Sequence, residues 1–115
     1  MKGRYQLEDQ GNLQLIMGLI INGGNAKSDA MEAIQAAKVE DFTLADQKLK
    51  DSDKSLVEAH RSQTSMLTAE ASGEATEVSL LLIHGQDHLM NAITFRDMAS
   101  EMVDMYKKMA GVAID

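Results

Sequence analysis

The stretch LLLIHGQDHLM, residues 80–90, places three ionisable side chains inside a run of large apolar residues. Residues three and four apart share one face of a helix, so His84, Asp87 and His88 are expected to form one polar cluster on a stripe of leucine and methionine. Across residues 78–93 apolar side chains occur on every side of the expected helix. Two other helices of one subunit cannot cover such a helix completely. This segment therefore predicts helix packing within the subunit and self-association around it.

The composition predicts an all-α fold. The chain has 115 residues, enough for a single domain over 1–115, and 44% of them are apolar. Proline is absent, there are two tyrosines and two phenylalanines, and the apolar residues are mainly Leu, Ile, Ala and nine Met. All of these except Ile are good helix formers. The lack of cysteine excludes disulfides and thiolate metal sites.

The periodicity of apolar residues predicts an antiparallel three-helix bundle, because the connections are short. The polar residues from 1 to about 12 are expected to be poorly ordered or irregular. Asp41 is a plausible N-cap for the second helix, and EASGEAT at 70–76 is the clearest loop, with Thr76 or a neighbour capping the third helix. The expected helices span about 13–37, 42–69 and 77–109.

The sequence NGGNA at 22–26 lies inside the first expected helix. Each interior glycine costs about 1 kcal/mol relative to alanine. Either the helix is kinked there or another backbone packs closely against it, and we favour close packing.

A formal charge of −7 limits the partners of the protein. It repels nucleic acid phosphates and anionic lipid, and it favours encounter with a basic protein. Residues 1–12 lack the apolar centre of a signal peptide, and no stretch approaches the roughly 20 apolar residues needed to cross a bilayer. We therefore expect a cytoplasmic protein with no membrane insertion and no nucleic acid partner.

Asp87 is the most costly residue of the polar cluster, since burying an unpaired carboxylate costs several kcal/mol. Arg96 is the nearest basic residue in the sequence. If subunits meet about a symmetry axis, their copies of Asp87 repel one another unless a cation lies between them, and three carboxylates with waters suit Mg²⁺. The alternative is that Asp87 is hydrogen-bonded to His88 or to waters.

His84 allows three interpretations. A neutral imidazole is a nucleophile that can carry a phosphoryl group, with Gln86 and His88 as candidate supports. It can also be a hydrogen-bonded core histidine. Third, His84 and His88 could share a structural zinc ion, but a zinc protease site would need glutamate where Gly85 stands. The remaining histidine, His60, is expected to be a structural or groove residue of the second helix.

Three segments resemble the enzyme IIA component of the lactose and cellobiose class of the bacterial sugar phosphotransferase system. They are MGLIINGGNAKS (17–28), EAHRSQT (58–64) and above all VSLLLIHGQDHLM (78–90). In that family alanine usually follows the reactive histidine. Gly85 departs from this pattern and is expected to loosen the helix slightly while leaving the acceptor in place.

The resemblance implies a cytoplasmic homotrimer of three-helix subunits, a nine-helix bundle. His84 would take a phosphoryl group from HPr, the histidine phosphocarrier, and pass it to a cysteine of the cognate enzyme IIB; the family suggests Nε2 as the acceptor atom. Asp87 would bind one divalent cation, usually magnesium, on the trimer axis, and Gln86 and His88 would support the phosphohistidine. The sugar would be a disaccharide such as lactose, cellobiose or chitobiose, and no residue of this protein should contact it.

A rival hypothesis from another class is a non-catalytic helical adaptor. In that case the buried polar or metal cluster only sets the register of an oligomer, as buried polar groups do in some helical assemblies.

Overall fold

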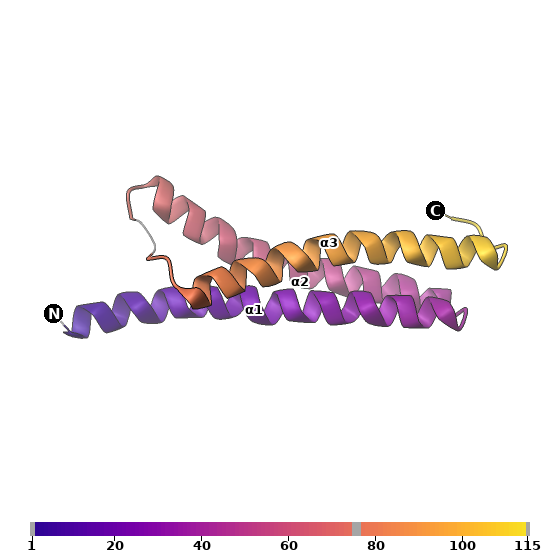
Figure 1. The fold of residues 1–115 in the computed structure, drawn as a ribbon, viewed down its shortest axis with the longest axis horizontal. Coiled ribbons are helices and arrows are strands. Elements are labelled where there is room, and N and C mark those ends of the chain that lie inside the picture. The colour runs from indigo at the N-terminus through magenta and orange to yellow at the C-terminus, as the bar shows by residue number, and fades with distance from the viewer. Residues whose placement is uncertain (1, 75–76, 115) are drawn as a thin grey trace.

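The protein folds into three long helices, and the computed structural model describes residues 2–74 and 77–114 (Figure 1). They are α1 (Lys2–Lys38), α2 (Phe42–Ala71) and α3 (Leu80–Met109). The helices alternate in direction and form a rod of 64 × 22 × 19 Å, with no strand among the described residues. The expected all-α, antiparallel three-helix bundle is confirmed. No helix in these residues is long and apolar enough to cross a membrane.

The starts of two helices are fixed by side chains that accept main-chain hydrogen bonds. Asp41 accepts from the amide of Leu44 at 3.2 Å, which confirms the expected N-cap of α2. At α3 the cap is Ser79, whose backbone is extended and whose hydroxyl accepts from the amide of Leu82 at 3.1 Å. The expected start at residue 77 is therefore wrong, while Thr76 lies outside the described residues.

The start of α1 differs from the expectation of an irregular first dozen residues. The helix begins at Lys2, so the backbone of residues 2–12 is helical rather than irregular. This segment contains no proline and is rich in residues that favour helix, such as Lys, Arg, Gln, Glu and Leu. A polar segment lacks the apolar periodicity by which a helix is recognised in a sequence. It can form a helix nevertheless.

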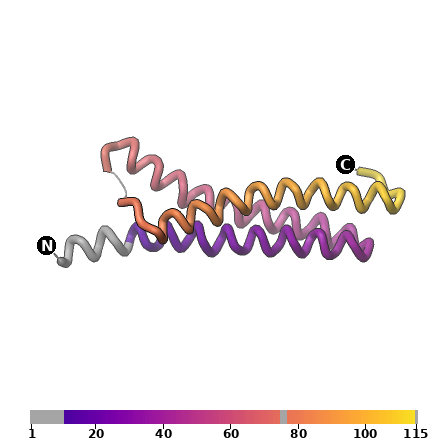
Figure 2. The backbone as a smooth tube through the Cα atoms, in the orientation of Figure 1, coloured from indigo at the N-terminus to yellow at the C-terminus, as the bar shows by residue number. Residues whose placement is uncertain are grey.

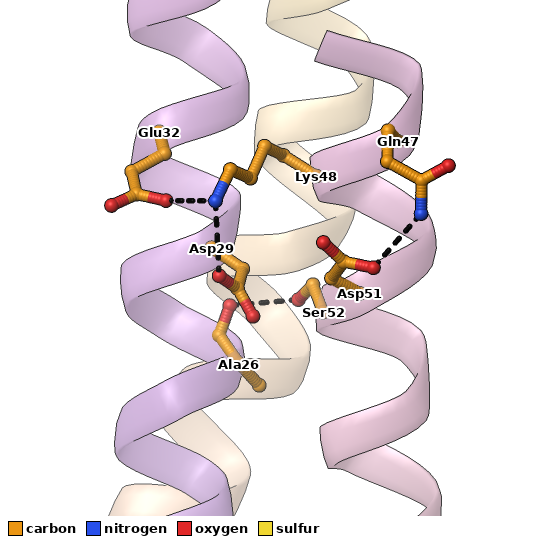
Figure 3. Close-up of polar contacts among 7 residues, drawn as sticks. All are labelled: Ala26, Asp29, Glu32, Gln47, Lys48, Asp51 and Ser52. Carbon is orange, nitrogen blue, oxygen red and sulfur yellow. Dashed lines mark hydrogen bonds and ion pairs between the residues drawn. The ribbon is translucent and has the colours of Figure 1, made fainter. Parts of the chain in front are cut away.

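Small residues seven positions apart form the contact faces of all three helices. A spacing of seven keeps side chains on one face of helices that coil gently around each other, and small side chains allow close approach. At one such position, Ser52 of α2 donates a buried hydrogen bond of 2.7 Å to the carbonyl of Ala26 in α1 (Figure 3). The buried small residues that follow this spacing are Gly23, Ala26, Ala30, Ala33 and Ala37 on α1, Ala45, Ser52 and Ala59 on α2, and Gly85, Ala92 and Ala99 on α3.

Ion pairs link α2 to its neighbours near the turn between α1 and α2. Lys48 reaches Glu32 at 2.6 Å and Asp29 at 3.9 Å on α1 (Figure 3). The hydrogen bond to Glu32 raises the pKa of Lys48, whereas burial raises the pKa of Asp29. These contacts hold α1 and α2 together at the end of the bundle remote from residues 80–90.

Two further ion pairs join α2 to α3. Lys107, nearly buried, lies 2.8 Å from Asp46, and Arg96 Nε lies 2.7 Å from Asp53. Beyond these contacts, the last turns of α2 diverge from α1 and α3 (Figure 2). The N-terminal half of α3 is therefore held mainly by α1.

Large apolar side chains remain exposed on the outer face of α3. Leu89 is fully buried, while Ile83 is 54% exposed and Met90 is 56% exposed. The prediction that apolar residues surround this part of α3 is thus confirmed, and one subunit leaves many of them uncovered. The exposed set on α3 is Leu80, Leu81, Ile83, Met90, Met98, Met102, Met105 and Met109.

Candidate functional site

The two histidines of α3 face each other one helical turn apart. The Nε2 atoms of His84 and His88 are 3.1 Å apart, and the rings meet edge to face with centroids 4.4 Å apart at 83°. His84 is exposed and His88 is half-buried. The two rings thus form one site, as the spacing in the sequence predicts, with the outer ring open to an incoming molecule.

The distance between the two nitrogens restricts their protonation. A neutral imidazole has one N–H and one nitrogen lone pair, so one ring must donate and the other accept. If His88 donates, His84 carries its own proton on Nδ1 and has a lone pair at Nε2 that can act as a nucleophile. If His84 donates, its nucleophilic nitrogen is Nδ1. The contact therefore couples the tautomer of one ring to that of the other.

Two glycines bring α1 and α3 together beneath this pair. A Cβ added at Gly23 would lie 3.2 Å from the carbonyl carbon and the carbonyl oxygen of His88. A Cβ added at Gly85 would lie 3.3 Å from the Cβ of Leu19 and 3.4 Å from the carbonyl oxygen of Ile16. The expectation of close packing at NGGNA is confirmed at Gly23. The contact also gives Gly85 a packing role beside the acceptor.

Gln86 lies on a different face of α3 from the histidines. Its side-chain oxygen accepts a 2.8 Å hydrogen bond from Nε2 of Gln63 on α2. Residues two apart on a helix do not face each other, so one subunit does not bring Gln86 to His84. In the sequence, Gln63 is a polar side chain on a mainly apolar stripe of the second helix, which is a signal of a buried polar contact. The sequence does not indicate that Gln86 is its partner.

Asp87 is exposed on the outer face of α3, between the exposed side chains of Ile83 and Met90. No ion pair found among the described residues includes Asp87, and Arg96 is engaged with Asp53. Among the side chains described, those of residues 11–74 and 77–114, none forms a hydrogen bond with the Asp87 carboxylate, and His88 contacts His84 instead. Asp87 is therefore an exposed carboxylate on a largely apolar surface.

His60 lies apart from the site on an exposed face of α2. It lines an open hollow of about 550 Å³ together with Val57 and Thr64. The neighbouring Arg61 bonds to Glu58 at 2.8 Å. His60 is thus a surface groove residue in a single subunit.

A metal ion has too few ligands within one subunit. Among the residues that the structure describes, no three His, Asp or Glu side chains gather closely enough to hold one. A structural zinc site takes four protein ligands, so the zinc interpretation of His84 and His88 lacks support in this part of the protein. Asp87 could hold a cation only together with groups from other molecules.

The fold and the site define an all-helical protein whose third helix carries adjoining histidines. The family model described as "PTS system, Lactose/Cellobiose specific IIA subunit" matches residues 14–107. The chain therefore belongs to the lactose/cellobiose-specific IIA family of the sugar phosphotransferase system.

Relatives and solved structures agree with this membership. The lichenan-specific phosphotransferase enzyme IIA component of Bacillus subtilis is 50% identical over 95 residues, covering 83% of this chain and 86% of the relative. The crystal structure of the cellobiose-specific enzyme IIA from Bacillus anthracis has a TM-score of 0.85 and 47% identity, covering 89% of this chain and 94% of that one.

A second similar structure contains a partner protein. It is the solution structure of the IIA(chitobiose)–HPr complex of the Escherichia coli system, with a TM-score of 0.75 and 36% identity. The match covers 86% of this protein and 96% of that one. The three relatives carry the names of three different sugars, so the family similarity alone does not select one of them.

Proposed function

We propose that this protein is the phosphocarrier of a cytoplasmic sugar-uptake system, with His84 as the phosphoryl acceptor. The observation that supports this most directly is the exposed ring of His84, whose Nε2 lies 3.1 Å from Nε2 of His88. Family membership supports the same role. The donor is phospho-HPr, the partner named in the complex of the Escherichia coli relative, and the acceptor is a cysteine of the cognate enzyme IIB.

In the first transfer the lone pair of Nε2 of His84 attacks the phosphorus of the donor phosphohistidine. The new N–P bond forms as the N–P bond of the donor breaks, and the electron pair returns to the donor ring. His84 keeps its proton on Nδ1 throughout. Such transfers depend chiefly on alignment and charge stabilisation, much of which a docked partner can supply.

His88 supports both states of the acceptor. Before transfer its N–H donates to Nε2 of His84 and so selects the Nδ1–H tautomer; this hydrogen bond opens as the donor docks, which frees the single lone pair of Nε2 to attack phosphorus. After transfer the same N–H can donate to a phosphoryl oxygen, because the phosphoryl group now occupies the neighbouring position. In the second transfer the thiolate of enzyme IIB attacks phosphorus, the N–P bond of His84 breaks, and the electron pair returns to Nε2.

Gln86 would support the phosphohistidine only across a subunit boundary, because its amide faces Gln63 within its own subunit. The sugar is a disaccharide such as lactose, cellobiose or chitobiose, held by the membrane component of the system. The names of the relatives leave these choices open.

We further propose that three subunits associate through the outer face of α3 to form a nine-helix bundle. Exposed Ile83 and Met90 on either side of Asp87 support this, because apolar patches of this kind mark interaction surfaces. Asp87 of each copy would then help hold one divalent cation, expected to be Mg²⁺. When bound, the cation offsets the repulsion of the three carboxylates. Chelation should weaken the association of the native protein, while Asp87→Leu should associate equally with and without chelator by light scattering.

The phosphocarrier role is tested with enzyme I, HPr and phosphoenolpyruvate. Intact mass under alkaline conditions should show one acid-labile phosphoryl group on the native protein and none on His84→Ala, with circular dichroism confirming that the variant is folded. His60→Ala is the matched control and should be phosphorylated normally. A folded native protein that takes up no phosphoryl group would contradict the proposal and favour the helical adaptor, in which the polar or metal cluster only sets the register.

A further inference from the structure

Gly24 has no packing reason to be glycine. A Cβ at Gly23 would press on the backbone of His88, but a Cβ at Gly24 would find nothing within 4 Å. Glycine weakens a helix interior relative to alanine because the unfolded state gains more freedom. The fold explains the first glycine and leaves the second without an explanation.

The position of Gly24 places this space beside the histidines. Successive residues of a helix are turned by about 100° and advance about 1.5 Å. Since Gly23 touches the backbone of His88, Gly24 lies at the same level of the bundle, turned from the contact toward open space. Gly23 is covered by His88, and Gly24 therefore leaves a position on α1 without a side chain next to the histidine pair.

Larger side chains bound this position along α1. Ile20 lies about one turn before the glycines and packs against the core. Lys27 lies about one turn after them, with its ammonium group 6.0 Å from the centre of the Phe95 ring on α3. Large side chains of α1 therefore stand before and after the glycines, whereas the two glycines place no side chain beside His88.

We propose that Gly24 forms a docking notch beside the contact of Gly23 with His88, which admits the backbone of the phosphoryl-donor protein to the exposed ring of His84. The inference rests on the proposed function. Reacting atoms must come within about 3–3.5 Å of each other before transfer. The donor carries its phosphoryl group on a short side chain, so its backbone has to approach α3 closely, and a side chain on α1 at this level would obstruct it.

Comparing a protein donor with a small donor distinguishes two effects of a substitution at Gly24. Obstruction of docking would slow only the protein donor, whereas damage to His84 would slow both donors. Gly24→Leu places a large side chain in open space and should not weaken the helix, because leucine favours helix more than glycine. Gln35→Leu is the matched control, an exposed position of α1 further along the same helix. Phosphoramidate is the small donor: the N–P bond to His84 forms, the P–N bond of phosphoramidate breaks, and ammonia leaves.

Gly24→Leu should slow phosphorylation by phospho-HPr by roughly tenfold or more, while phosphoramidate labels it as fast as the native protein. Gln35→Leu should match the native protein with both donors. Equal slowing with both donors would overturn the notch, since the acceptor itself would then be altered. Unchanged transfer from phospho-HPr would also overturn it.

The oligomer mass of Gly24→Leu, measured by light scattering, should equal that of the native protein. A different mass would overturn the proposal, because it would show that a second copy of the protein occupies the space beside Gly24. Failure of the proposed function would look different from all of these outcomes. In that case the native protein itself would accept nothing from phospho-HPr.

Discussion

Nε2 of His88 lies 3.1 Å from Nε2 of His84, so the two rings share a single proton along their contact. The partner ring is half-buried and is backed by Gly23 of α1, whereas His84 is exposed. The tautomer of the exposed ring is therefore coupled to that of the inner ring.

Replacing His88 should slow phosphoryl transfer without removing it. His88→Ala loses the N–H that selects the Nδ1–H tautomer of His84, and we expect transfer from phospho-HPr to slow on the order of 10- to 100-fold. His88→Gln should recover part of the rate, because its amide can also donate a hydrogen bond. Rapid-quench single turnovers measure this. Equal rates for His88→Ala and the native protein would remove His88 from the mechanism.

Neighbouring glycines should respond in opposite ways to the same change. Gly24→Ala should stabilise the protein by up to about 1 kcal/mol, because alanine favours helix and the added methyl meets open space. Gly23→Ala should destabilise by about 1–3 kcal/mol, because its methyl meets the backbone of His88 at 3.2 Å. Urea unfolding at one fixed protein concentration compares them. Similar midpoints for the two variants would argue against close packing at Gly23.

The Gln63–Gln86 hydrogen bond should appear as a strong coupling in a double-mutant cycle. Replacing either glutamine alone by leucine leaves the other amide half-buried without its partner, which should cost about 1–3 kcal/mol. Replacing both should cost much less, because no unpaired amide remains. Additive losses in the free energy of unfolding would show that this bond contributes nothing to the joining of α2 and α3.

The contribution of Asp29 to the free energy of unfolding should decrease as pH rises. A carboxylate whose pKa is lowered by a salt bridge would do the opposite. Burial raises its pKa above the ordinary value of 3.8, so its protonated form favours the folded state. That contribution is fully present below pH 3.8 and is lost as pH rises through the folded-state pKa.

Asp29→Asn, which resembles the protonated form, should therefore be more stable than the native protein at neutral pH, by less than about 1 kcal/mol. The difference should shrink as pH falls below 3.8, where the native side chain is itself protonated. Thermal unfolding across pH measures it. A lower melting temperature for the variant at neutral pH would mean that the contact with Lys48 outweighs burial.

Much of the architecture follows from local features of the sequence. The cap at Asp41 and the close packing at Gly23 each depend on residue types at neighbouring positions, and both are confirmed. The loop expected over 70–76 begins later, because Glu70 and Ala71 still belong to α2, and residues 75–76 lie outside the described residues. The contact of His84 with His88 likewise needs only the spacing of one helical turn.

The features that the sequence did not predict depend on how the helices are registered against one another. Gln63 and Gln86 meet across two helices, and periodicity on each helix does not say which residues lie at the same level. The contrast between Gly23 and Gly24 arises in the same way, since it depends on which glycine faces α3. The first residues of α1 were missed for another reason: a polar segment has no apolar stripe, even when it is helical.

The divergence of the last turns of α2 has a consequence for motion. At the level of the histidines, α1 packs closely on α3 through Gly23 and Gly85, whereas α2 is joined to it by the hydrogen bond of Gln63 with Gln86. The end of α2 can therefore open and close by local fluctuation while the acceptor stays braced on α1. Backbone amides after Gln63 should accordingly exchange their hydrogens with solvent sooner than those around His88.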